Sequence, residues 1–95
     1  YDQRVAEREA QVAEAEAENT RLTAQLASLR GEHGRAKNAL IQARAAAKKR
    51  GAKLSAGQEA QVSAALRSNP NKAASLRKAI ADARALADNL KRLSS

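Results

Sequence analysis

The sequence contains no cysteine, methionine, phenylalanine or tryptophan, and Tyr1 is its single aromatic residue. Without cysteine the chain can form no disulfide and offers no thiolate for catalysis or metal binding. The lack of aromatic side chains argues against recognition of single-stranded nucleic acid by base stacking. No segment approaches the roughly 18 consecutive apolar residues of a membrane helix. The chain begins at Tyr1 without a methionine, so we expect a preceding part that this sequence does not include.

Candidate catalytic and metal-binding residues are also scarce. His33 is the only histidine, and it lies in a glycine-containing stretch where we expect a loop. Glu14, Glu16 and Glu18 are two residues apart, so on a helix they point in different directions and do not converge on a metal. The glycines lack the Gly-Lys-Ser/Thr ending of a phosphate-binding loop. We therefore expect no enzyme activity, no cofactor and no metal site.

Large aliphatic residues are few, at 10 leucines, 3 valines and 2 isoleucines, beside 25 alanines. A 95-residue chain with so few bulky side chains is poorly equipped to build a core by itself. Alanine, however, is the strongest helix former, and its placement here follows a helical repeat. We expect an all-α chain that gains much of its burial from partner helices.

Apolar residues recur on one seven-residue frame from the start of the chain to Leu54, and this repeat is its most informative pattern. With Val5 at position a, the frame predicts a seam that faces another helix. The predicted helix-pairing residues are Val5, Val12, Asn19, Leu22, Leu26, Leu29 and Leu40. Asn19 at a would fix register and oligomer number, unless it is simply a surface residue near a weak part of the seam.

The charge distribution and the glycines divide the chain into three predicted segments. Residues 1–30 hold four basic and six acidic residues, whereas residues 31–95 hold fourteen basic and four acidic ones. We predict an Ala-rich acidic coiled-coil helix over 1–30, a glycine hinge and basic helix over 31–54, and a C-terminal helical hairpin over 55–95. Each glycine costs about 1 kcal/mol inside a helix, so Gly31 and Gly34 favour a break.

Two alternatives to a simple hinge remain at these glycines. Folding the chain back there would place Lys48, Lys49 and Arg50 opposite the acidic residues 14–18 of the first helix. Against any break, the heptad frame continues across both glycines without a slip, as a single continuous rod would require.

Capping signals place the later helices. Gly51 is expected to stop the basic helix after Arg50, and Ser55 with Gln58 forms a capping box for a helix that reaches Arg67. Asn69 and Pro70 read as the N-cap and first residue of a last helix, antiparallel to the one before it. The predicted packing residues of that last helix are Leu76, Ile80, Leu86, Leu90 and Leu93.

Residues 35–53 contain seven basic residues and no acidic one. This segment can be a solvated flank, can pair with the acidic first helix, or can bind an acidic protein, a membrane surface or nucleic acid. The predicted contacts to an acidic partner or to phosphate are Lys37, Arg44, Lys48, Lys49, Arg50 and Lys53.

We therefore predict a non-enzymatic structural protein that self-associates or docks on partner proteins through coiled-coil helices. An acidic coiled coil joined to a basic hairpin is similar in plan to scaffolding and internal proteins of bacteriophage particles, without a shared motif. The alternative is an accessory nucleic-acid-binding protein of plasmid-partition or nucleoid type that uses residues 35–53. The sequence favours a cytoplasmic or virion-associated location without fixing it, and the helix orientation and oligomer number stay open.

Overall fold

The computed structural model describes residues 2–93; Tyr1, Ser94 and Ser95 lie outside this range. Three helices make up the described chain: α1 (Asp2–Lys49), α2 (Ala56–Arg67) and α3 (Ala73–Leu93). The molecule is an elongated rod with extents of 75 × 19 × 15 Å. No strand occurs within residues 2–93, and the all-α prediction is confirmed.

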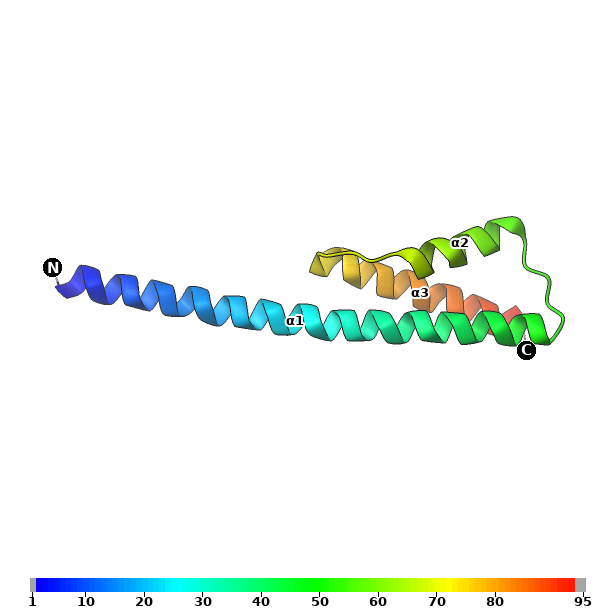
Figure 1. Cartoon of the computed structure of the whole chain (residues 1–95), viewed down its shortest axis with the longest axis horizontal. Coiled ribbons are helices and arrows are strands. Elements are labelled where there is room, and N and C mark those ends of the chain that lie inside the picture. Colours follow the sequence, from blue (N-terminus) through cyan, green and yellow to red (C-terminus); the bar gives the residue numbers. More distant parts are fainter. Residues whose placement is uncertain (1, 94–95) are drawn as a thin grey trace.

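The three helices lie side by side over one half of the rod. In Figure 1, α1 and α3 run in the same direction, and α2 runs in the opposite direction on the far side of α3 from α1. Residues 56–93 thus form the predicted antiparallel hairpin. The main packing partner of α3, however, is α1 and not α2.

The core is centred on a seam between α1 and α3, and Val62 of α2 packs against it. Buried positions on both helices are separated by alternating steps of three and four residues, the spacing of a coiled coil. The buried residues are Leu29, His33, Ala36, Leu40, Ala43 and Ala47 on α1, and Leu76, Ile80, Ala83, Ala87 and Leu90 on α3. Beside this seam, Arg84 Nη2 lies 3.9 Å from Glu32 Oε2.

The predicted break at Gly31 and Gly34 is wrong, because α1 passes through both glycines as one helix. The alternative in which the chain folds back at these glycines is excluded for the same reason. Seam residues Leu29, His33 and Ala36 surround the glycines and pack against α3. Their burial offsets the backbone penalty of about 1 kcal/mol per glycine. The uninterrupted heptad frame was therefore the better guide.

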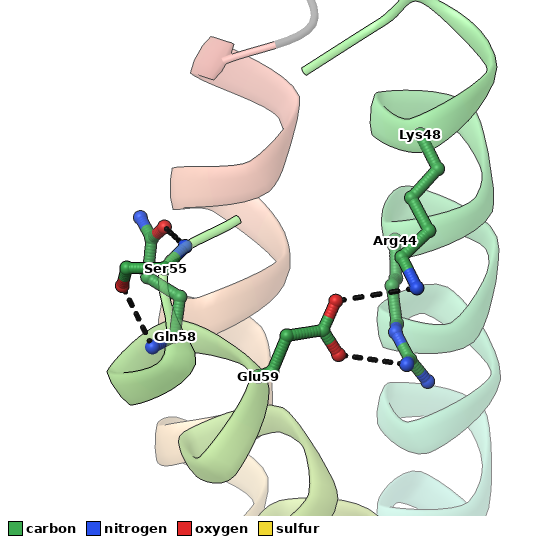
Figure 2. Close-up of polar contacts among 5 residues, drawn as sticks. All are labelled: Arg44, Lys48, Ser55, Gln58 and Glu59. Carbon is green, nitrogen blue, oxygen red and sulfur yellow. Dashed lines mark hydrogen bonds and ion pairs between the residues drawn. The ribbon is translucent and has the colours of Figure 1, made fainter. Parts of the chain in front are cut away.

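The predicted end of a helix near residue 50 is confirmed, and so is the predicted start of the next helix at Ser55. Gly51, with φ +87°, donates its N–H to Lys48 O at 3.1 Å, and Ala52 N donates to Ala47 O at 3.0 Å. This paired arrangement is the Schellman motif that ends many helices at glycine. At the start of α2, Gln58 N donates to Ser55 Oγ, and Ser55 N donates to Gln58 Oε1 (Figure 2).

The start and the packing face of α3 differ from the prediction. The helix begins at Ala73 and not at Pro70, and Leu76 N donates to Lys72 O at 2.8 Å. Residues 68–72 form the connection between α2 and α3, so Asn69 and Pro70 lie in the turn and not at the start of the helix. On the packing face, Leu76, Ile80 and Leu90 are buried as predicted. Leu86 is only half-buried and Leu93 is 49% exposed, whereas Ala87 lies in the seam.

Candidate functional site

The first half of α1 extends beyond the rest of the molecule. Every residue from 2 to 24 is exposed, and Figure 1 shows this part of α1 projecting past α2 and α3. We call residues 2–24 the arm and residues 25–93 the body. On the arm, Val5, Val12 and Leu22 are 42%, 54% and 42% exposed. They occupy positions a, a and d, so the helix-pairing seam of the arm faces solvent.

The predicted seam is thus divided between two environments. Leu29 and Leu40 are buried against α3, and Leu26 is half-buried against the same core. The other four predicted seam residues, Asn19 among them, lie exposed on the arm. α3 packs against the second half of α1 and covers the seam there. Along the arm no helix packs on the seam, so it stays exposed.

The arm carries more negative than positive charge. Within residues 2–24, six carboxylates accompany Arg4, Arg8 and Arg21. One exposed ion pair joins Arg21 Nη2 to Glu18 Oε1 at 3.6 Å. Exposed pairs of this kind contribute little to stability. The arm therefore presents an apolar stripe flanked by a predominantly acidic surface.

Two of the predicted basic contacts are engaged inside the chain. Arg44 Nη2 donates to Glu59 Oε2 at 2.7 Å, and Lys48 Nζ lies 3.2 Å from Glu59 Oε1 (Figure 2). The hydrogen bond from Lys48, together with the positive charges of Arg44 and Lys48, holds the pKa of Glu59 below its ordinary value. These contacts tie the start of α2 to the second half of α1.

Glu59 was not singled out in the sequence, although a signal was present. It is the only acidic residue between Glu32 and Asp82. A lone carboxylate within a strongly basic region is a natural ion-pair partner for whichever basic side chains the fold brings near it. The sequence did not show that α2 turns this carboxylate toward α1.

Three of the other predicted basic contacts lie together at one end of the body. Lys49, Arg50 and Lys53 are exposed where α1 ends and the chain turns toward α2, whereas Lys37 is half-buried further back. The last turns of α1 and α3 lie at the same end of the rod (Figure 1). We call the residues of this end the basic end: Lys48, Lys49, Arg50, Lys53, Lys91 and Arg92.

His33 occupies an unexpected position. It lies at a in the α1–α3 seam, only 4% exposed, and not in a loop. Its Nε2 has no hydrogen-bond partner among the described residues. Burial, and then the nearby charge of Lys37, lowers the pKa of His33 below its ordinary value. The otherwise aliphatic seam therefore favours the neutral form of this imidazole.

Among residues 2–93, no three histidine or acidic side chains come together in a way that would hold a metal ion. Nor does any described helix combine the length and the apolar character required to cross a membrane. Comparisons with protein-family models, with curated proteins and with solved structures find no match to this chain. The described chain exposes the apolar seam of the arm at one end of the rod and the basic end at the other.

Proposed function

We propose that this chain is a non-enzymatic assembly protein that associates through the exposed helix-pairing seam of its arm. The observation that supports the proposal most directly is the exposure of Val5, Val12 and Leu22 along one heptad stripe. Only two other large hydrophobic residues of the described chain are as exposed: Ile41, in the second half of α1, and Leu93, at the end of α3. The arm therefore concentrates the apolar surface that a partner helix would cover.

The physical reason for association is the apolar stripe that the unpaired arm leaves in water. Most helical stability in proteins comes from packing of such a face and not from helix propensity. Complete burial of an exposed valine or leucine side chain contributes about 1.5–3 kcal/mol, and covering these half-exposed side chains contributes a part of that. Pairing therefore stabilises both the helical conformation of the arm and the complex. A role as a scaffolding or internal component of a large particle, such as a phage virion, agrees with this plan at the level of architecture.

Light scattering on the purified chain over a range of concentrations tests the proposal. We expect a discrete oligomer at micromolar concentration and at least a tenfold weaker association for Leu22→Asp. The matched control is Ala17→Asp, which introduces the same charge at position f, away from the seam. A monomeric mass at every concentration, or equal effects of the two substitutions, would contradict association through this surface.

A second candidate function uses the basic end. Lys49 and Lys53 are exposed there, beside the last turns of two helices that both end in basic residues. Such a cluster suits a phosphate backbone, with sequence-independent and salt-sensitive binding. It supports the alternative of an accessory nucleic-acid-binding protein.

Binding of a random DNA duplex, followed by fluorescence anisotropy at two salt concentrations, tests this second function. The double variant Lys49→Gln/Lys53→Gln should bind more weakly and with a shallower salt dependence. The control Arg77→Gln/Lys78→Gln removes the same charge near the start of α3. Equal losses in both double variants would indicate a general charge effect and argue against a site at the basic end.

A further inference from the structure

We infer that the arm pairs with the arm of a second copy of this chain, in the antiparallel orientation. The inference rests on the proposed assembly function and specifies its partner and geometry. Its starting point is the continuity of the seam. The heptad stripe of the arm runs without interruption into the body, where α3 covers it from Leu29 to Ala47.

The position of α3 excludes a parallel pair in register. A parallel second copy would lie in the seam of the arm and continue past Leu26, because its own α1 is an unbroken helix of 48 residues. It would then enter the space occupied by α3, which follows the same seam in the same direction (Figure 1). An antiparallel second copy instead leads away from the body after it passes the tip of the arm.

Antiparallel pairing also matches the seam residues to one another. Full overlap of the two arms places residue n opposite residue 27 − n of the second copy, so that position a faces position d. Val5 then faces Leu22, and Val12 faces Ala15. Each apolar seam residue of the arm thereby meets an apolar residue.

The two polar seam residues face each other in the same alignment. Arg8 at d lies opposite Asn19 of the second copy, and both occur twice because of the two-fold symmetry. The Asn19 side-chain oxygen accepts hydrogen bonds and the Arg8 guanidinium donates them. The two residues that would weaken an apolar seam therefore satisfy one another, and a shift of one heptad would separate them.

Charges outside the seam predict how the affinity of the dimer depends on salt concentration. Each arm has six carboxylates and three guanidinium groups, and Glu9 approaches Glu16 of the second copy along one flank. These like charges repel, and salt screens the repulsion. Dimer affinity should therefore rise between 20 and 200 mM salt, opposite to the decrease expected for DNA binding.

Cysteine cross-linking tests the orientation, since the natural chain has no cysteine to interfere. Val5→Cys and Leu22→Cys chains are prepared separately, mixed, equilibrated and oxidised. We expect a cross-linked dimer in the mixture and little in either variant alone, because position 5 faces position 22 and not itself. In the control pair, Ala10→Cys and Ala17→Cys, the two positions are also opposite one another along the helix axis. Both lie at position f, on the side away from the seam, so they should not cross-link.

Each outcome separates this inference from the proposed function. Cross-linking of Val5→Cys alone, or of Leu22→Cys alone, would mean a parallel pair and overturn the inference, while association through the arm would stand. A dimeric mass without any cross-link would overturn it in favour of another site, such as the groove between α2 and α3 lined by Ala64, Ala79 and Leu86. A monomeric mass would overturn both.

A double-mutant cycle provides a second measurement. If Arg8 contacts Asn19 of the second copy, Arg8→Ala and Asn19→Ala should not act independently on the dimer dissociation constant. The double variant should lose less affinity than the product of the single losses. In a parallel pair, these residues are 11 positions, or about 16 Å, apart along the helix axis, and their effects would multiply. Independent effects would therefore contradict the antiparallel alignment.

Discussion

At the scale of single residues, His33 is the clearest departure from an ideal seam. The other position-a residues of α1 in the body are the half-buried Leu26 and the fully buried Leu40 and Ala47. A neutral imidazole can be accommodated there, but its protonated form would place a charge inside the seam beside Lys37. Protonation of His33 therefore opposes the packing of α3 on α1.

This position predicts how stability depends on pH. The pKa of His33 is lowered in the folded chain, so the unfolded chain binds its proton more readily. The free energy of unfolding should have its full value above pH about 6.5, the ordinary histidine pKa. Below it, stability should fall with decreasing pH, by at most about 1.4 kcal/mol per pH unit for one proton. Urea unfolding between pH 8 and pH 5 measures this slope.

His33→Leu is the matched variant for that experiment. It keeps an apolar side chain of similar size in the seam and removes the titrating group. Its unfolding free energy should be nearly independent of pH over the same range, because the low pKa of Glu59 places the titration of that carboxylate below this range. An unchanged slope in His33→Leu would assign the pH dependence to other groups.

At the scale of elements, the two helical glycines of α1 differ from the glycine that ends it. A Cβ at Gly34 would meet no atom within 4 Å, so Gly34→Ala should raise the unfolding free energy by about 0.5–1 kcal/mol. Gly51 has φ +87°, so Gly51→Ala should lower it by about 1–2 kcal/mol. Urea denaturation of both variants checks the pair. Destabilisation by Gly34→Ala would contradict a continuous helix at that position.

Sequence patterns predicted the elements wherever the local signal and the tertiary packing agree. The Ser55–Gln58 capping box and the stop at Gly51 depend on neighbouring residues alone, and both are present. At Gly31 and Gly34 the local penalty of glycine was known and the unbroken heptad frame argued against a break, but the compensating contact is made by α3, which begins only at Ala73. Local rules therefore failed where a distant helix decides.

The predicted helix-pairing residues show the same difference between what a local pattern predicts and what a distant helix decides. The heptad frame correctly placed Leu29 and Leu40 in a helix interface. It could not distinguish the part of the seam that α3 covers from the part that the arm exposes, because both parts follow one repeat. In α3, the predicted stripe included Leu86, whereas the three-four spacing that runs through Leu76 and Ile80 places the smaller Ala87 in the seam.

At the scale of the whole molecule, the unbroken α1 sets the length expected of a dimer that pairs through its arms. The chain alone is 75 Å long. Two chains overlapping by their arms should give a maximum dimension of about 110 Å, at 1.5 Å per helical residue. Small-angle X-ray scattering on the dimer, compared with the Leu22→Asp variant, measures this difference. A dimer no longer than the single chain would contradict pairing by the arms.

The shared direction of α1 and α3 has an electrical consequence. Two helix C-termini each place about half a negative elementary charge at one pole of the rod, and the N-terminus of α2 offsets only one of them. Lys48, Lys49, Lys91 and Arg92 occupy those last turns, and Asp2 lies in the first turn of α1. The formal charges therefore generate a moment opposed to that of the backbone. Acetylation of the lysines would weaken this compensation and leave the backbone field at that pole less neutralised.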